Sequence, residues 1–491
     1  MTASVPMFHG LALAALWVAL ANLTVKAQAS PADSAEVTAL KAKATAGEVG
    51  AMFELAERYR LGRGLAINWD EAARWFGEAT RKGHLPSTER LGEMQLFGRG
   101  LAQNDLAARN CLEHAADNGD GRAMYFLGLL AAEGRGVRQD PAAALDWFRK
   151  SAAAGEARGM VSLGTALASK LGGPAREGEA EAWLAKGREV HDQSAAQGDA
   201  ESAFALGVLL QFGIGVPADP AKAVDAFRRA AELGSTDAML LLGRMFEQGE
   251  GIAKDAEQCR AWWLKSAERG DPRGMHLLGV GYDEGTLGPK YPAEAAKWAR
   301  RGADSGYAPA MYLLGQCYLT GAGLARDDKQ AREWFAKGAR LRHGPSLTQV
   351  GLAAAAGSGG KADPVLAAMF FRSAAEAGDV DGAFHLAEAY VAGRGLDQDE
   401  KQALRWYREA AYLGHDAAGY QLARLYAAGQ GIEKNDKLAA FWHSHSAHLG
   451  HREAMLALSA AYAAGTGLDK DERLAADWKA KAEAANKQPP K

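Results

Sequence analysis

The chain has 491 residues, of which 48% are hydrophobic and 24% charged, a composition typical of a folded globular protein that excludes wholesale disorder. Lysine and arginine together number 57 against 60 aspartates and glutamates, so the formal net charge is −3. This balance provides no general electrostatic attraction to nucleic acid or to anionic lipid, and we expect neither as a partner.

The N-terminal segment differs from the rest of the chain. Residues 11–20 are an unbroken apolar run, and the small-residue sequence Ala27-Gln28-Ala29 follows it. The run is shorter than the roughly 20 residues that a membrane-spanning helix needs, and the pattern is typical of a secretory signal cleaved before Ser30. We therefore expect residues 1–29 to be a signal peptide, the mature protein to be periplasmic or secreted, and no membrane insertion after cleavage. An uncleaved membrane anchor is the alternative.

One unit recurs along nearly the whole remaining chain. A core leucine or valine returns every 36 residues, with a single interval of 43, at Leu55, Leu91, Leu127, Leu163, Leu206, Leu242, Leu278, Leu314, Val350, Leu386, Leu422 and Leu458. Twenty residues after the core position comes a tryptophan in nine of the twelve units. Such a fixed period is the signature of a repeat architecture.

Each unit predicts two helices. In residues 123–155, apolar residues spaced by four around Leu127 mark one helix face, and Gly134 ends that helix because glycine readily adopts the left-handed conformation. Asp140 can then cap a second helix that begins at Pro141. The Gly-x-Gly between the helices resembles a phosphate-binding loop, but it recurs in most of the units without a suitably placed lysine. We interpret it as a connector.

The block "AMYFLGLLAAEGRGVRQDPAAALDWFRKSAAAG" closely resembles the Sel1-like repeat, a relative of the tetratricopeptide repeat, and comparable blocks begin at Ala310 and Ala418. The resemblance covers about residues 47–485. It implies an all-α fold, a right-handed α-solenoid of about twelve antiparallel helix pairs, and a non-catalytic adaptor function in assembling protein complexes. Exported bacterial members of the family resemble envelope scaffolds, periplasmic regulators and host-interaction proteins.

The cysteines depart from one bacterial branch of that family, which has paired cysteines in nearly every repeat and is associated with penicillin binding. This chain has three, Cys111, Cys259 and Cys317, an odd number that encodes no disulfide framework. We interpret all three as buried packing thiols.

The repeat boundaries divide the chain into consecutive segments. After the signal peptide we expect a capping helix in residues 30–47, repeats 1–4 in 48–198, repeats 5–8 in 199–344, repeats 9–12 in 345–485 and a polar tail in 486–491. The fourth unit contains seven extra residues, which predict an extended second helix, with a docking protrusion or a change of superhelical phase as alternatives. The low bulk of residues 345–360 predicts the weakest interface between repeats, and we hypothesise a hinge there.

No motif for catalysis stands out, since the HEXXH, GXSXG and CXXC patterns do not occur. We therefore predict a protein that is not an enzyme and has no cofactor. The best metal candidate is a histidine group, His415, His443, His445, His448 and His451, in which His445 and His448 share a helix face. We favour exposed polar residues near a helix end over a metal site, and we predict no metal.

The first helices carry the most informative pattern. Aromatic residues two positions before the core residue, with mixed charged residues further along the same stripe, would line the concave surface of a tetratricopeptide-like array. The candidate partner-binding residues are Phe53, Tyr125, Phe204, Tyr312, Phe384, Tyr420, Glu57, Arg244, Glu388 and Arg424. Two interpretations stay open: the aromatics pack between successive first helices, or they form an amphipathic groove for a peptide or helix of a partner.

We therefore expect an exported interaction scaffold of the bacterial envelope or extracellular space that binds one or more protein partners in a concave groove. A binder of cell-wall glycan or exported polysaccharide is the first alternative, because aromatic side chains at a groove also suit sugars. An envelope hydrolase is the alternative from another class.

Overall fold

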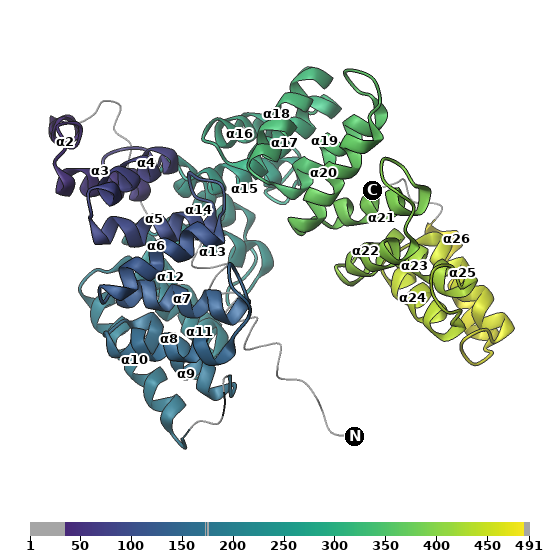
Figure 1. Cartoon of the computed structure of the whole chain (residues 1–491), viewed down its shortest axis with the longest axis horizontal. Helices are drawn as coiled ribbons and strands as arrows, with labels where there is room; N and C mark the ends of the chain where they lie inside the picture. The colour runs from purple at the N-terminus through teal and green to yellow at the C-terminus, as the bar shows by residue number, and fades with distance from the viewer. Residues whose placement is uncertain (1–34, 172, 174–175, 486–491) are drawn as a thin grey trace. The chain divides into compact units, whose positions relative to one another are not determined.

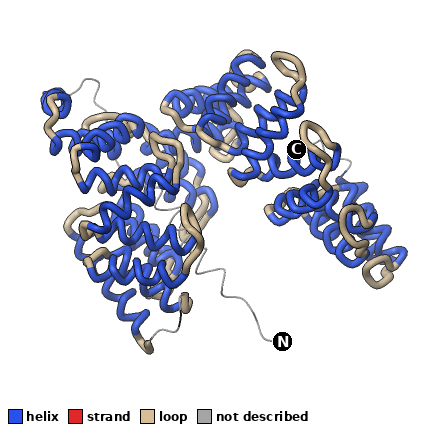
Figure 2. Tube along the Cα trace, viewed as in Figure 1, coloured by secondary structure: helices blue, strands red, loops and turns tan. Residues whose placement is uncertain are grey.

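The structure is a computed structural model that describes residues 35–485 except 172, 174 and 175 (Figure 1). The expected signal peptide and the polar tail lie outside the described residues. Within them the chain forms 25 α-helices joined by loops, as Figure 2 shows, and this confirms the all-α repeat fold. The helices comprise α2 (Ala35–Thr45) followed by twelve consecutive pairs.

The first helices of the pairs are α3 (Val49–Leu61), α5 (Leu85–Phe97), α7 (Gly121–Glu133), α9 (Ala157–Ala168), α11 (Ala200–Phe212), α13 (Thr236–Gln248), α15 (Pro272–Glu284), α17 (Ala308–Thr320), α19 (Gly344–Ala356), α21 (Val380–Ala392), α23 (Asp416–Ala428) and α25 (Arg452–Ala464). The second helices are α4 (Trp69–Arg81), α6 (Asp105–Asp117), α8 (Pro141–Ala153), α10 (Glu179–Ala196), α12 (Pro220–Glu232), α14 (Ala256–Glu268), α16 (Pro292–Asp304), α18 (Asp328–Arg340), α20 (Pro364–Glu376), α22 (Glu400–Tyr412), α24 (Asp436–His448) and α26 (Glu472–Ala485).

The Gly-x-Gly connector has a separate physical reason for each glycine. Gly134 ends α7 with φ of 72°, and its N–H donates to the Leu130 carbonyl, which is a left-handed helix cap. Gly136 also has a positive φ, and a Cβ there would lie 2.9 Å from the carbonyl oxygen of Asp105, in the preceding second helix. The loop is therefore a close contact between neighbouring pairs, and the Asp140 carboxylate then accepts hydrogen bonds from the first turn of α8.

The core alternates small and large residues between the two helices of a pair. Gly128 of α7 lies directly under the ring of Phe148 of α8, so that any larger residue at Gly128 would collide with it. Several of the second-helix tryptophans carry a basic side chain over the ring, as Trp334 does with Lys337 3.4 Å from its ring centroid. The fold is thus held together by packing within and between pairs.

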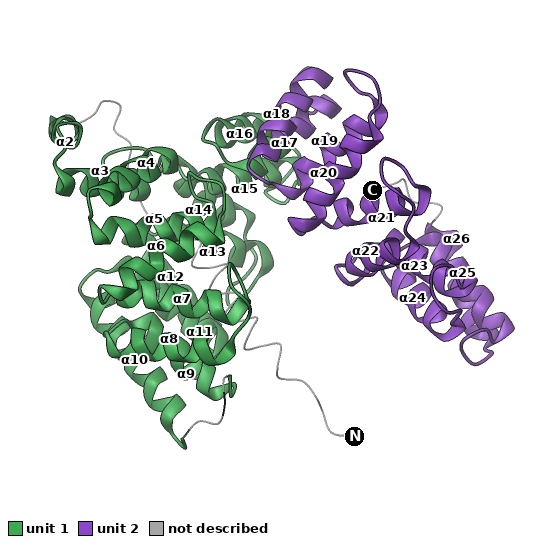
Figure 3. Ribbon diagram, in the orientation of Figure 1, with its two compact units in different colours: residues 1–313 green, residues 314–491 purple. Residues whose placement is uncertain are grey.

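The chain divides into two compact units, residues 1–313 and 314–491, shown in Figure 3. The division falls inside α17. At the start of unit 1, α2 buries Val37 and Ala44 in a cluster with Leu55. The fourth pair has the extended second helix that its extra residues predict, because α10 has 18 residues where α8 has 13.

Candidate functional site

In unit 1 the first helices point charged side chains at one another. Six arginines and six carboxylates from seven first helices and their ends form this group, which we call the ionic network: Glu57, Arg60, Glu89, Arg90, Glu93, Arg99, Arg122, Arg158, Glu201, Asp237, Asp271 and Arg273. Its formal charges cancel when all members are ionised. Buried charges require such pairing, because an isolated one costs several kcal/mol.

The links of the ionic network join repeats that are far apart in sequence. Arg122 of α7 lies 2.8 Å from Glu93 of α5 and 3.1 Å from Glu201 of α11, a residue 79 positions away. Arg158 of α9 reaches the same Glu201 carboxylate at 2.6 Å. One carboxylate therefore ties together helices of three different pairs.

The seventh pair comes back to the first. The Arg273 guanidinium, near the start of α15, lies 5.6 Å from the ring centroid of Trp69, the first residue of α4. A Cβ at Gly270 would lie 3.0 Å from the backbone nitrogen of Ile67, so the two backbones are also close. Arg273 further binds Asp237 at 2.7 Å and Asp271 at 2.6 Å. The first-helix face of unit 1 is consequently filled by its own side chains.

Burial and the neighbouring arginines shift the pKa values of carboxylates in the ionic network in opposite directions. Burial alone would raise the pKa of Glu93, but Arg122 and Arg90 outweigh it and lower that pKa to about 2. In Asp237 burial prevails over the neighbouring arginines and raises the pKa to about 7, and burial does the same for Glu89. Carboxyls with a pKa near 7 suit acid–base chemistry, but these two have almost no exposed surface for a substrate to reach.

The candidate groove residues of unit 1 mostly lie inside the protein. Tyr125 is completely buried, and Phe204 and Glu57 are also buried. Phe53 is half-buried, packed 5.8 Å from the Phe76 ring and 5.0 Å from the His84 ring, while Arg244 is exposed. In this unit the aromatics pack between helices, because the superhelical turn closes over them.

Unit 2 leaves the same face accessible. Phe384 and Tyr420 are half-buried, each stacked on the histidine that precedes the next first helix: Phe384 on His415 at 4.3 Å and Tyr420 on His451 at 4.8 Å. One helical turn beyond the rings, Glu388 and Arg424 are exposed. Around them lie further exposed residues, so we define the unit 2 first-helix face as Asp381, Phe384, Glu388, Val391, Tyr420, Arg424, Glu453 and Leu456. Tyr312, on the part of α17 that belongs to unit 1, is also half-buried.

A row of charged residues contributes to the closure of unit 1 and was not predicted from the sequence. Five residues before the core leucine, five consecutive repeats carry a charge: Arg122, Arg158, Glu201, Asp237 and Arg273. All five belong to the ionic network. A row of charges of both signs at the repeat spacing is a signal of contacts between repeats, and it was present in the sequence.

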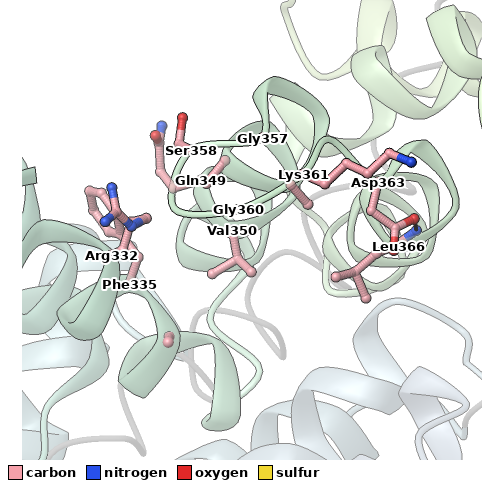
Figure 4. Close-up of a pocket in the computed structure, with 13 residues that line it drawn as sticks. Arg332, Phe335, Gln349, Val350, Gly357, Ser358, Gly360, Lys361, Asp363 and Leu366 are labelled. Atoms are coloured by element: carbon pink, nitrogen blue, oxygen red, sulfur yellow. Dashed lines mark hydrogen bonds between the residues drawn. The ribbon is translucent and has the colours of Figure 1, made fainter. Parts of the chain in front are cut away.

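The low-bulk ninth repeat produces a hollow. A cavity of about 250 Å³ lies between α18, α19 and the start of α20, with Arg332 and Phe335 on one side and Val350 across from them (Figure 4). In the next pair, Tyr390 fills the equivalent space and accepts a hydrogen bond from Arg372.

Both members of that bonded pair are alanine one repeat earlier. Ala354 stands 36 residues before Tyr390, Ala336 stands 36 residues before Arg372, and both line the cavity. The cavity therefore marks the absence of a tyrosine and an arginine. It coincides with the hinge hypothesised at residues 345–360, which remains a prediction.

The histidines of unit 2 have structural contacts. His415 and His451 accept hydrogen bonds from the backbone N–H groups of Ala418 and Ala454 at helix starts, and His443 is buried, with its pKa lowered to about 4 by burial. In residues 35–485, apart from the three left undescribed, no three His, Cys, Asp or Glu side chains are placed to hold a metal ion.

The cysteines are free thiols. Cys259 and Cys317 are buried as expected, whereas Cys111 is only partly so. Burial raises the pKa of Cys111 and raises that of Cys259 to about 12. A raised pKa disfavours the reactive thiolate.

The comparison with protein families finds the Sel1 repeat eleven times, at residues 49–84, 86–120, 121–156, 200–235, 236–271, 272–307, 308–343, 345–379, 380–415, 417–451 and 452–486. The chain belongs to the Sel1 repeat family. No match covers residues 157–199, which form the fourth helix pair with its long α10. Proteins of this family are commonly interaction scaffolds and generally non-catalytic, and they typically bind protein partners.

Two solved Sel1-repeat structures resemble this one. A protective antigen of uropathogenic Escherichia coli strains is 29% identical, with 92% of this chain and 91% of that one covered and a TM-score of 0.45. A Sel1 repeat protein from Oxalobacter formigenes is also 29% identical, with 50% and 99% covered and a TM-score of 0.46. Both TM-scores lie below 0.5, so the family assignment rests on the repeat matches. The search of curated proteins found no match.

Proposed function

We propose that this Sel1-repeat protein is an exported, non-catalytic scaffold that holds a protein partner on the unit 2 first-helix face. The observation that carries the proposal is the contrast between the units. The ionic network fills the first-helix face of unit 1, whereas in unit 2 Glu388 and Arg424 are exposed beside the half-buried Phe384 and Tyr420. Half-buried rings with accessible charges around them suit an amphipathic segment of a partner.

Export and an envelope location belong to this proposal and rest on the N-terminal sequence. No helix in the described part of the chain is both long enough and apolar enough to span a bilayer. Fractionation of cells together with N-terminal sequencing of the mature protein tests export. A mature chain that begins at Ser30 in the periplasm or medium supports it, and a cytoplasmic chain that retains residues 1–29 contradicts it.

A protein segment fits the face better than a glycan. Sugars bind by stacking on flat aromatic faces, but one face of each ring is covered by an imidazole: the Phe384 and His415 planes differ by 17°, and those of Tyr420 and His451 by 22°. The exposed residues beside the rings are mostly charged: Asp381, Glu388, Arg424 and Glu453. These groups suit hydrogen-bonding backbone and charged side chains of a peptide.

The direct test is site-specific photo-crosslinking in cells. A photoreactive amino acid at Glu388 or Arg424 should give a discrete crosslinked protein, identified by mass spectrometry, while the same group at Asp225, exposed on α12 of unit 1, should not. The double variant Glu388→Ala/Arg424→Ala, which keeps Phe384 and Tyr420 stacked on His415 and His451, should weaken capture of the identified protein. Equal crosslinking from Asp225, or no adduct from unit 2, contradicts the proposal.

A further inference from the structure

The outer surface of unit 2 breaks the pattern that the second helices otherwise follow. The sixth residue of a second helix is charged or small in most pairs: Arg74, Asn110, Asp146, Asp225, Ala261, Lys297, Glu333, Arg405 and Asp477. In α20 it is Met369 and in α24 it is Phe441, which are 62% and 56% exposed. A large apolar side chain thus stands where the repeat normally presents a polar or small one to solvent.

A second position deviates in the same direction. The thirteenth residue of a second helix is Arg81, Asp117, Ala153, Glu232, Glu268, Asp304, Arg340, Glu376, His448 or Ala484 in the other regular pairs. In α22 it is Tyr412, which is 70% exposed. Packing within the repeat does not require an aromatic ring at this thirteenth position, because nine of the other regular pairs have a charged residue or alanine there and the tenth has histidine.

The two deviating rings contact the same buried indole. Tyr412 and Phe441 both contact the indole of Trp442 edge-on, at centroid distances of 5.1 and 5.2 Å. The exposed Leu413 follows Tyr412, and the exposed Leu438 lies one turn before Phe441 on the same side of α24. We call Tyr412, Leu413, Leu438 and Phe441 the outer patch. A cluster of exposed apolar side chains is typical of an interaction site.

A positively charged hollow adjoins the outer patch. A depression of about 450 Å³ follows α22 and is lined by Lys401, Leu404, Arg405, Arg408, Glu409, Tyr412 and Leu413. Its three cations face a single carboxylate. Among the described residues Lys401 and Arg405 make no ion pair, and Arg408 donates to the Tyr426 hydroxyl. The hollow beside Tyr412 therefore carries a net positive charge.

We propose that the outer patch and this hollow form a docking site for an acidic amphipathic helix of a partner protein. Apolar residues spaced by three and four on such a helix would cover Tyr412 and Phe441, and its carboxylates would meet Lys401 and Arg405. The charge argues against a second copy of this chain, since a two-fold contact would place the same cations opposite one another. The site lies on second helices, separate from the unit 2 first-helix face, so the scaffold can hold two partners.

The test uses the mature full-length chain and two synthetic helical peptides with the same apolar face, one with glutamate and one with lysine on the polar face. We expect fluorescence anisotropy to show the acidic peptide binding at least about ten-fold more tightly than the basic one. Tyr412→Ala/Phe441→Ala should weaken acidic-peptide binding about ten-fold or more. Lys401→Glu/Arg405→Glu should reverse the preference between the peptides.

Two control variants separate this site from other surfaces. Leu106→Ala removes an equally exposed apolar residue from α6 of unit 1, and Glu388→Ala/Arg424→Ala changes the unit 2 first-helix face; neither should alter binding of the acidic peptide. Equal affinity for both peptides, no binding of either, or unchanged binding by the Tyr412→Ala/Phe441→Ala variant overturns the proposal. So does a dimer, seen by sedimentation, that this variant dissociates, because the occupant is then a second copy.

Discussion

Arg273 is the residue whose substitution should most weaken the contact between the seventh and the first helix pair of unit 1. Its guanidinium binds the carboxylates of Asp237 and Asp271, both without exposed surface, at 2.7 and 2.6 Å. Arg273→Met keeps most of the stem and removes the charge. Breaking a buried pair on one side costs about 3–5 kcal/mol, because the opposite charge stays buried without compensation. Asp271 keeps its hydrogen bond from the backbone N–H of residue 273, so Asp237 carries most of the loss.

Hydrogen exchange is the suitable assay, because a long repeat array does not unfold in one two-state step. At about 1.4 kcal/mol per factor of ten, protection of α13 and α15 amides should fall by roughly two to three orders of magnitude. The loss should shrink as the pH is lowered. Burial already raises the pKa of Asp237 to about 7, above its value in the unfolded chain, so its protonation below that pH favours the folded state.

Two further variants serve as controls for Arg273→Met. Arg228→Met breaks an exposed pair with Asp225 and should change protection very little, by less than about 1 kcal/mol. Arg273→Met combined with Asp237→Asn and Asp271→Asn removes the buried charges together and should recover most of the loss. Wild-type protection in Arg273→Met, or no recovery in the triple variant, would show that these charges do not hold the turn closed.

Three further changes test separate parts of the structure. Gly395→Ala should lower local stability by about 2–4 kcal/mol, because φ is positive there and a Cβ would collide with the Pro364 carbonyl. Gly414→Ala, with open space around it, should cost about 1 kcal/mol, and hydrogen exchange of the α22 amides compares the two variants. The pKa of His443, lowered to about 4, lies below its unfolded value near 6.5, so stability should fall by up to about 3 kcal/mol as the pH drops through that window. His443→Gln should flatten this dependence, and the exposed His448→Gln should not. Ala336→Arg/Ala354→Tyr should fill the cavity beside α19 and raise the free energy of local opening in α19, measured by hydrogen exchange, by about 1–2 kcal/mol. Unchanged exchange would mean that this cavity is not a weak point of the array.

The repeat fold was predictable because its determinants are local. The period places the core residues, Gly134 ends a helix by its backbone conformation, and Asp140 starts the next by capping it. Each of these features acts within a few residues and recurs, so errors in one unit are corrected by the others. The longer α10 also followed from a local count of extra residues.

The state of the first-helix face was not predictable in the same way. The aromatic stripe places Tyr125 and Phe384 at equivalent positions, yet the structure buries Tyr125 completely and leaves Phe384 partly accessible. The difference depends on the curvature of the array, which sums small rotations between pairs over many repeats. The charged row from Arg122 to Arg273 signals the closure, but only contacts across 79 residues show which charges meet.

Footprinting of carboxyl groups tests the contrast between the two units most directly. The intact protein is treated with a water-soluble carbodiimide and an amine at neutral pH, and modification at each carboxylate is read by mass spectrometry. Glu89, Glu93, Asp237 and Asp271 should stay unmodified, while Asp381, Glu388 and Glu453 react readily. Rapid modification of the first four would mean that the first-helix face of unit 1 is open, and would contradict the assignment of partner binding to unit 2.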